Sequence, residues 1–481
     1  MSVLVIDVGT TGLRAAIVRR DGTVANLRYE KCPPTSPFPG LVEFDAAAIA
    51  QATLRVANEV LSKSGPVDAV GITTQRASTV MWDARTLEPL APGLGWQDLR
   101  TVGDCISARA EHGLILAPNQ TATKAKWLLT NTPIADRSVV RIGTIDSYVA
   151  AVLSNGTLHV TDHSNAAVTG LFSLDDMSWS SRICDLMGVD VDMLPTIVPS
   201  SGVVGHASAL AGSPPIACLV GDQQSSLVGQ GCITPGKTKI TFGTGGMLDV
   251  ATGRVAPQSA QRSSGGTFPI IAHSDAEGIE FGAEAIMLSA GSNVEWLCED
   301  LGLIESPADS DAIAASVDSS DGVVYVPALL GLGTPNWDYG ARGTLLGITR
   351  GTTRAHIVRA VLEGIAQRGA DLVDAARVDT GCTISALRID GGMSRNATFV
   401  HALANASMLP VEVSPVTEAT TLGAGFLAGV AVGTWQTLAD AATTWAPTTI
   451  VEPTSPLDRD RWRDAVGRAA GWIPELSGLD F

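Results

Sequence analysis

Near its middle the chain reads Ile216-Ala217-Cys218-Leu219-Val220-Gly221-Asp222-Gln223-Gln224. The apolar residues of this stretch predict a buried strand, which ends at Gly221 where a helix could begin. Ligands of open α/β sheets collect beyond the carboxyl ends of the strands, so Asp222 is placed where a carboxylate could take a proton from a bound molecule. The alternative is that Asp222 serves only as the N-cap of the helix, a role that aspartate favours. Glycine-rich turns on either side of the stretch favour the first interpretation.

Three such turns follow predicted strands in widely separated parts of the chain. The first, Asp7-Val8-Gly9-Thr10-Thr11-Gly12, joins two strands of a predicted hairpin and matches neither the Rossmann nor the P-loop pattern. The second, Gly243-Thr244-Gly245-Gly246, again lies between two predicted strands, and the third, Gly391-Gly392-Met393-Ser394-Arg395-Asn396, follows one. Backbone N–H groups and hydroxyls in such turns can hold phosphate oxygens. Their repetition predicts a duplicated α/β unit with a nucleotide between the two copies.

The composition narrows the class of partner. A formal net charge of -17 argues against nucleic acid or an anionic membrane as the main partner. The seven cysteines include no C-x-x-C pair, so neither a disulfide framework nor a zinc site is indicated. No signal peptide is apparent, and the most apolar later stretch, residues 422–432, is about half as long as a membrane span. We therefore expect a cytoplasmic protein. The glycines in and just after the apolar stretch, Gly425, Gly429 and Gly433, are expected to allow close helix packing.

The length of 481 residues predicts two or three domains. A break at Thr234-Pro235-Gly236 divides the chain into near-equal halves, and we place the domains at residues 1–232 and 233–481. A helical stripe over residues 356–375 predicts a packed helix with Thr352 or Thr353 as its N-cap.

Motifs along nearly the whole chain resemble the FGGY family of sugar and polyol kinases, and within it the glycerol-kinase branch. They lie at residues 7–14, 72–76, 96–98, 123–129, 221–224, 243–245, 331–338, 341–343, 343–363 and 390–392. The resemblance implies an α/β protein with two actin-like (ribonuclease-H-like) ATPase domains, and with ATP and Mg²⁺ in the interdomain cleft. Residues 1–232 would bind substrate and phosphate, and residues 233–481 the nucleotide. A homodimer or homotetramer is also implied.

The resemblance gives matching residues their roles. Asp222 looks like the general base that takes the proton of the substrate hydroxyl as it attacks the γ-phosphorus. Asp7 would hold Mg²⁺ through water, since Mg²⁺ keeps much of its hydration. Arg14 suits phosphate oxygens, although outside the motif a surface ion pair would be the simpler interpretation. The positions that match phosphate contacts are Thr10, Thr11, Arg14 and Thr244, and those that match the adenosine site are Gly291, Glu295, Gly392 and Asn396.

The substrate side departs from the glycerol-kinase pattern. Ala77 stands where that branch usually has glutamate, Asn119 where it has tyrosine, and Met247 where it has an aromatic residue. Loss of one carboxylate and two rings predicts a roomier pocket. The retained substrate residues are Arg76, Trp96 and Gln223. Trp96 could equally be a core residue.

We therefore expect an ATP-dependent phosphotransferase that acts on a hydroxyl of a small polyol or ketose with four or five carbons. A true glycerol kinase is the alternative within the family. An actin-like or Hsp70-like ATPase with a binding or structural role is the alternative from another class, although it leaves the motif at residues 221–224 without an explanation.

Overall fold

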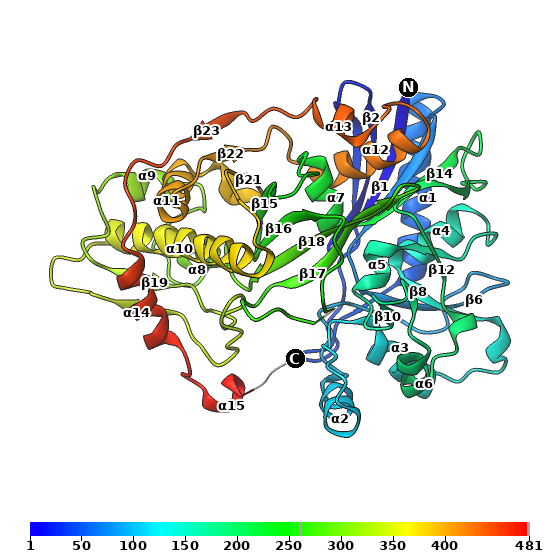
Figure 1. Ribbon diagram of the computed structural model, residues 1–481, viewed down its shortest axis with the longest axis horizontal. Helices are drawn as coiled ribbons and strands as arrows, with labels where there is room; N and C mark the ends of the chain where they lie inside the picture. The colour runs from blue at the N-terminus through cyan, green and yellow to red at the C-terminus, as the bar shows by residue number, and fades with distance from the viewer. Residues whose placement is uncertain (260, 479–481) are drawn as a thin grey trace.

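The computed structural model describes residues 1–259 and 261–478 of the protein. Figure 1 shows two central β-sheets with helices packed around them. In the described chain the first sheet has the strand order β13-β14-β5-β1-β2-β3 and the second has the order β17-β18-β16-β15-β21-β22-β23. We call each sheet with its packed helices the first lobe and the second lobe.

The main strands have the following bounds. The first sheet contains β1 (Ser2–Val8), β2 (Gly12–Arg19), β3 (Val24–Lys31), β5 (Ala69–Thr74), β13 (Ser201–His206) and β14 (Pro215–Gly221). The second contains β15 (Thr238–Phe242), β16 (Gly246–Gly253), β17 (Phe268–Asp275), β18 (Gly278–Met287), β21 (Leu387–Asp390), β22 (Val411–Val413) and β23 (Thr449–Val451). A smaller sheet beside the first consists of β4 (Glu43–Phe44), β7 (Gly93–Leu94), β6 (Thr79–Asp83) and β8 (Val140–Thr144).

The two large sheets repeat one plan. In the first, β1, β2 and β3 pair in antiparallel fashion, and β5 and β14 continue the sheet in parallel on the other side of β1. In the second, β15, β16 and β18 are antiparallel, and β21 and β22 continue in parallel beyond β15. The predicted hairpins at the first two glycine-rich turns, the strand before the third turn and the duplicated α/β unit are therefore confirmed.

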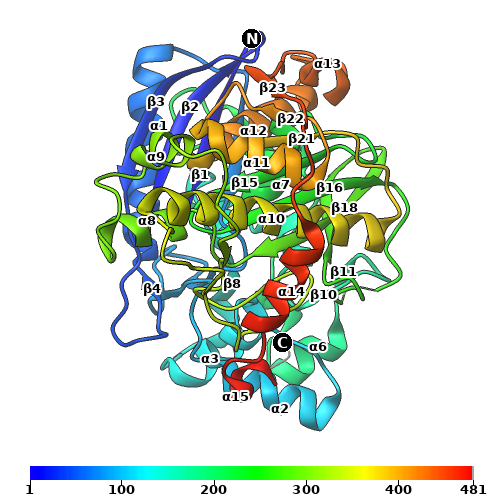
Figure 2. The ribbon, with the colours of Figure 1, turned by 90° about the vertical axis from the view of Figure 1, so that its left-hand side faces the viewer.

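Helices cover both sheets. The longer ones are α1 (Ala46–Ser64), α2 (Val102–His112), α3 (Thr121–Asn131), α4 (Ile145–Leu153), α7 (Asp222–Gly229), α8 (Ser292–Glu299), α10 (Arg354–Thr380), α11 (Ala397–Ser407), α12 (Ala419–Ala431) and α14 (Arg459–Ala469). The shorter ones are α5 (His163–Ala167), α6 (Ser181–Met187), α9 (Asp309–Ala315), α13 (Leu438–Ala442) and α15 (Pro474–Ser477). In Figure 2, which faces the second lobe, α10 runs across the front of its sheet and α14 lies below α10.

Side chains of the first sheet alternate between two apolar cores. Leu4 and Ile6 pack with α1 and α4, whereas Val3 and Val5 pack with α12, as the two-residue period of a strand requires. Helix α12 belongs to the second half of the sequence, yet it covers a face of the first sheet. The boundary at residues 232 and 233 therefore does not separate the two lobes completely.

Glycines bring α12 unusually close to its neighbours. A side chain on Gly423 would collide with the Ser225 carbonyl of α7, and one on Gly425 would lie 2.6 Å from Val18. Close packing was predicted for Gly425 and Gly429, and it is confirmed at both. The prediction is wrong for Gly433, which has open space around it and a φ of +78°, so its backbone conformation is what favours glycine there. In the described part of the chain, no helix combines the length and apolar character needed to cross a membrane.

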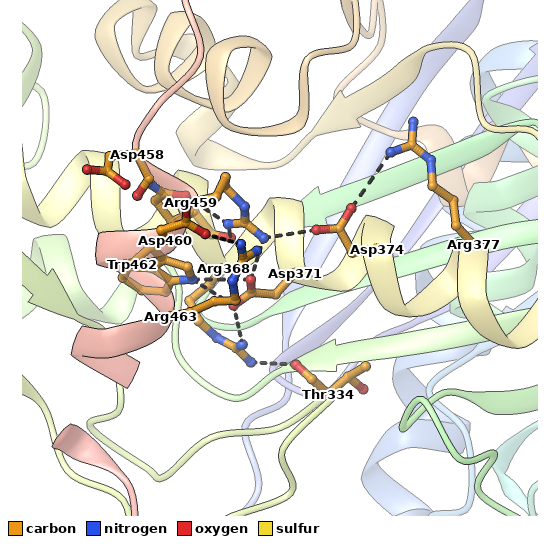
Figure 3. Close-up of polar contacts among 11 residues, drawn as sticks. Thr334, Arg368, Asp371, Asp374, Arg377, Asp458, Arg459, Asp460, Trp462 and Arg463 are labelled. Atoms are coloured by element: carbon orange, nitrogen blue, oxygen red, sulfur yellow. Dashed lines mark hydrogen bonds and ion pairs between the residues drawn. The ribbon is translucent and has the colours of Figure 1, made fainter. Parts of the chain in front are cut away.

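The helix predicted over residues 356–375 is α10, which begins at Arg354 after a capping box formed by Thr353 and His356. The second half of α10 contacts α14 through a polar cluster around Asp371 (Figure 3). Arg459 donates to Asp371 at 2.6 Å, and Trp462 donates to the same carboxylate. Arg368 donates to Asp371 at 2.8 Å. This cluster holds α14 against the second lobe.

Candidate active site

Asp222 lies where the two lobes meet. It is the first residue of α7, directly after β14, and Gly221 occupies the N-cap position with φ -65° and ψ 149°. The Asp222 carboxylate accepts the N–H of Gln223 at 2.8 Å, and its side chain is 27% exposed. The predicted strand and helix are therefore confirmed, and Asp222 is not the N-cap. Its carboxylate remains accessible for chemistry.

Arg76 connects Asp222 to the second lobe. It follows β5, and its Nε lies 3.7 Å from Asp222 Oδ1. Its Nη2 donates to Glu284 Oε2 of β18 at 2.6 Å. A Cβ on Gly221 would lie 2.8 Å from Arg76 Cδ, so the absence of a side chain lets the arginine cross the end of β14. One guanidinium thus lies between carboxylates that come from different sheets.

Gln223 also contacts the second lobe. Its Oε1 accepts a hydrogen bond from Lys239 Nζ of β15 at 2.7 Å, and Lys239 lies 2.7 Å from Asp249 of β16. Met247 stands two residues before Asp249 on the same strand, so the two side chains share a face. Met247 is therefore on the side of the second sheet that faces Gln223.

The first glycine-rich turn brings a further set of residues to this junction. Asp7 and Arg14 are cross-strand partners, with Arg14 Nη1 3.4 Å from Asp7 Oδ2. Arg14 Nε lies 3.3 Å from Glu418 Oε2, just before α12. Trp96 is 39% exposed, so it is not a core residue, and its Nε1 donates to Thr10 Oγ1 at 3.2 Å. The expected substrate wall and phosphate turn are therefore in direct contact. Thr11, beside Thr10, is exposed.

Ala77 and the loop that carries Asn119 lie next to each other. Ala77 is buried with a φ of +61°, and its carbonyl accepts the hydroxyl of Thr121 at 3.2 Å. Asn119 is exposed, and its backbone carbonyl accepts a hydrogen bond from Lys124 at 3.0 Å. Because Ala77 follows Arg76 directly, this loop borders the same junction.

On the nucleotide side, Gly291 packs against the second glycine-rich turn. Its N–H donates to the Gly243 carbonyl at 2.8 Å, and a Cβ there would come within 2.6 Å of the same oxygen. Thr244 is exposed beside it, and its carbonyl accepts the N–H of Ala290. Glu295 is exposed in the first turn of α8. Thr244 and Gly291 are thus brought together at the edge of the second sheet.

Gly392 and Asn396 flank the third turn. A Cβ on Gly392 would meet nothing within 4 Å, so its bare backbone faces open space. The amide of Asn396 is used at both ends: Oδ1 accepts the N–H of Phe399 as a helix cap, and Nδ2 donates to Ser310 at 3.0 Å. Asn396 therefore has a structural role here, and its adenosine contact stays a prediction.

The carboxylates at the junction are poised for a cation. Burial raises the pKa of Asp7 to about 7, against the lowering effect of Arg14 and with further upward contributions from Asp222 and Glu418. Burial also raises the pKa of Asp222, while Arg76 and the Gln223 N–H oppose the shift. Among the described residues no group of three ligating side chains could hold a metal alone. Mg²⁺ needs only one or two carboxylates when phosphates and water complete its shell, so this set fits it.

Sequence reasoning missed four charged residues here: Lys239, Asp249, Glu284 and Glu418. Three of them lie in largely buried strands, where a charge is unfavourable unless it is paired. That pattern could have indicated them. Glu418 precedes a helix, where an acidic residue is ordinary, so no local signal distinguishes it.

Comparison with known proteins agrees with this arrangement. Residues 2–229 match the N-terminal domain, and residues 238–432 the C-terminal domain, of the FGGY family of carbohydrate kinases. A glycerol kinase from Trichlorobacter lovleyi is 39% identical over 496 residues, which cover 98% of this chain and 99% of that protein.

Solved structures show the same fold. The Plasmodium falciparum glycerol kinase with ADP has a TM-score of 0.90 at 28% identity, over 97% of this chain and 98% of its own. A xylulose kinase from Rhodospirillum rubrum has a TM-score of 0.86 at 22% identity, over 99% of this chain and 100% of its own. The predicted family and the pair of actin-like domains are confirmed. The chain belongs to the FGGY family of carbohydrate kinases, phosphotransferases with an alcohol group as acceptor.

Proposed function

We propose that this chain transfers the γ-phosphoryl group of ATP to a hydroxyl of a small polyol, with glycerol as the first candidate. The position of Asp222 carries the proposal, because a partly exposed carboxylate at the start of α7 lies beside Arg76 at the junction of the lobes. The relatives named glycerol kinase support glycerol as the acceptor.

Asp222 is the general base of this reaction. It accepts the proton of the substrate hydroxyl while the hydroxyl oxygen bonds to the γ-phosphorus. The bond from that phosphorus to the oxygen shared with the β-phosphate breaks, and ADP leaves. Burial raises the pKa of Asp222, which makes it a stronger base, and the nearby Arg76 cation favours its ionised form. Arg76 and Gln223 donate hydrogen bonds to the remaining hydroxyls, and Trp96 forms an apolar wall.

The nucleotide lies between the glycine-rich turns in this proposal. Thr10, Thr11 and Arg14 hold phosphate oxygens from one side and Thr244 holds them from the other. When bound, Mg²⁺ would neutralise charge on the phosphates, and Asp7 would hold it through water. The proposed adenosine residues are Gly291, Glu295, Gly392 and Asn396. The open backbone face at Gly392 supports this placement.

A polyol or ketose with four or five carbons is the second candidate. Ala77 carries no carboxylate next to Arg76, Asn119 lies exposed on the adjoining loop, and the flexible Met247 shares a strand face with Asp249. These three positions lack the carboxylate and the two rings that a tight site for a three-carbon triol would use. They favour a longer substrate.

A substrate panel tests both candidates. ADP release is measured with glycerol, tetritols, pentitols and the matching ketoses, for the wild type and for Asp222→Asn, with the exposed Asp464→Asn on α14 as control. Turnover that depends on the alcohol and is lost in Asp222→Asn supports the kinase. A clear preference for glycerol would overturn the second candidate. ATP hydrolysis that persists in Asp222→Asn without any alcohol would instead favour a binding or structural ATPase.

We also propose that the division at residues 232 and 233 separates the substrate-binding half of the sequence from the nucleotide-binding half. The two family matches end and begin on either side of it. The cytoplasmic location remains a prediction. The assembly into a homodimer or homotetramer is also a prediction, which light scattering of the purified protein tests.

A further inference from the structure

We propose that three charged residues of the second sheet, Lys239, Asp249 and Glu284, are positioning residues for the substrate side chains of the first lobe. We call these three residues the charge row. The inference rests on the proposed function, because that proposal assigns Gln223 and Arg76 to the substrate. The further inference is that the charge row, in the second lobe, orients the hydrogen-bond donors of Gln223 and Arg76, which belong to the first lobe.

The register of three neighbouring strands forms the charge row. Lys239 of β15 stands opposite Asp249 of β16, and Asp249 stands opposite Glu284 of β18. Directly opposed residues project from the same face of a sheet, so the three side chains form one line. Ile240 and Leu248, which alternate with the row, pack in the core with α10 on the other face. The charge row therefore faces the first lobe.

Lys239 determines how the Gln223 amide is oriented. Its side chain is fully buried, and its ammonium group donates to Gln223 Oε1 at 2.7 Å and to Thr241 Oγ1 at 3.1 Å, and it forms an ion pair with Asp249 Oδ2 at 2.7 Å. An ammonium group donates three hydrogen bonds and accepts none. A flipped amide would place its NH₂ group against this cation. Lys239 therefore keeps the Gln223 oxygen, and the Nε2 donor is left for a substrate hydroxyl.

Glu284 has the same relation to Arg76. The Glu284 carboxylate accepts a hydrogen bond from Arg76 Nη2 at 2.6 Å, so the Nε edge of the Arg76 guanidinium is turned toward Asp222. Arg76 Nη1 is buried and has no acceptor among the described residues. A buried guanidinium N–H is expected to have a partner, so Nη1 is the donor that a hydroxyl of the substrate would satisfy.

Asp249 completes the arrangement. It is fully buried, and its partner in the ion pair is Lys239. An unpaired charge would be unfavourable at this depth, so Asp249 is the counter-charge that holds the Lys239 side chain in place. Because the charge row belongs to one lobe and its targets to the other, the substrate donors are arranged only while the lobes are together. Separation of the lobes would release Gln223 and Arg76 at the same time.

The first test removes the buried ion pair as a unit. In K239M/D249L both charges are replaced by apolar side chains of similar size, so no lone charge is left in the interior. We expect the KM for the alcohol to rise about tenfold through loss of one oriented hydrogen bond, while the KM for ATP stays within about twofold. Equal rises in both KM values would overturn the inference, because they would indicate general disruption of the fold.

A double-mutant cycle tests whether the pair acts through Gln223. If the pair acts through Gln223, Gln223→Ala alone raises the KM for the alcohol. Combining Gln223→Ala with K239M/D249L then raises this KM no further than K239M/D249L alone. Independent, additive effects would contradict the proposal. For Arg76 the variant is Glu284→Gln, with Glu412→Gln as matched control, since Glu412 lies at the far end of the same cross-strand line and pairs with Arg388 at 3.0 Å. Only Glu284→Gln should raise the KM for the alcohol.

The outcomes separate this inference from the proposed function. If the wild type phosphorylates none of the alcohols, the proposed function fails. If it phosphorylates one of them and the charge-row variants leave its KM unchanged, this inference alone fails. Thermal unfolding of every variant identifies those that do not fold, and if K239M/D249L is among them, the comparison of Glu284→Gln with Glu412→Gln decides.

Discussion

Two polar clusters in the interior of the protein differ in how completely their carboxylates are paired. Around Asp371, both carboxylate oxygens accept hydrogen bonds, from Arg368, Arg459 and Trp462 (Figure 3), although Arg368 Nε has no hydrogen-bond partner among the described residues. Around Asp222, Arg76 Nη1 has no acceptor, and the Asp249 oxygens accept no hydrogen bond of good geometry although Lys239 lies 2.7 Å away. The paired cluster joins two helices of one lobe. The incompletely paired cluster lies between the lobes, where a ligand would supply the missing partners.

The largest expected effect belongs to the incompletely paired cluster. Asp222→Asn removes the proposed base, and changes at a general base reduce kcat by roughly 10² to 10⁴. The melting temperature should stay nearly unchanged, because Asp222 makes no hydrogen bond that holds other elements together. Steady-state ADP release measures kcat, and calorimetry on the same preparation measures the melting temperature. If Asp222→Asn instead kept full activity and lost much of its melting temperature, the Asp222 cluster would have a structural role and not a catalytic one.

The next effect belongs to the paired cluster. Asp371→Ala leaves Arg368 and Arg459 without their shared carboxylate, and breaking a buried pair in this way costs about 3 kcal/mol. Urea unfolding measures the loss, and the KM for the alcohol should not change. Asp464→Ala is the matched control on α14, since its ion pair with Arg468 is 63% exposed on both sides and should leave the unfolding midpoint where it was. Equal losses in the two variants would remove the contrast.

A smaller effect is expected from adding a carboxylate next to Arg76. Ala77→Glu supplies an acceptor for two hydroxyl protons, so the ratio of kcat/KM for glycerol to that for a pentitol should rise about tenfold. Ala77→Gln adds similar bulk without charge and serves as the control. If both variants change the ratio equally, then volume and not the carboxylate determines the preference.

The smallest effect is a shift in pH dependence. Burial raises the folded-state pKa of Asp222 above the ordinary value of 3.8, so its ionised, active form is lost at a higher pH than in an exposed aspartate. The rate kcat should therefore fall as the pH decreases, with a midpoint above 3.8. A pH–rate profile at saturating ATP and alcohol measures this midpoint, and a midpoint at or below 3.8 would contradict the raised pKa of Asp222.

Much of the fold follows from local sequence. The hairpin turns at residues 7–12 and 243–246 and the helix α10 depend on glycines, alternation and capping within a few residues, and these were predicted. Asp222 was predicted because a strand, a glycine and an acidic residue stand in order. The family roles of Thr244 and Glu295 came from resemblance and remain predictions.

Other features depend on residues far apart in the chain. Glu284 meets Arg76 across 208 positions, through the register of β18 and the contact between lobes, which no short window contains. The position of α12 on the first sheet was missed for the same reason. Its apolar run predicted packing, but the run does not specify which sheet receives it.

The position of α12 has a consequence for any attempt to express the halves of the protein alone. A fragment that stops at residue 232 would keep every strand of the first sheet but lack the helix that shields Val3, Val5 and Val18. That apolar surface would be exposed to solvent, and large exposed apolar surfaces promote aggregation. A fragment that extends through α13 would regain this helix, but it would also contain most strands of the second sheet. The first lobe is therefore not one continuous stretch of the chain.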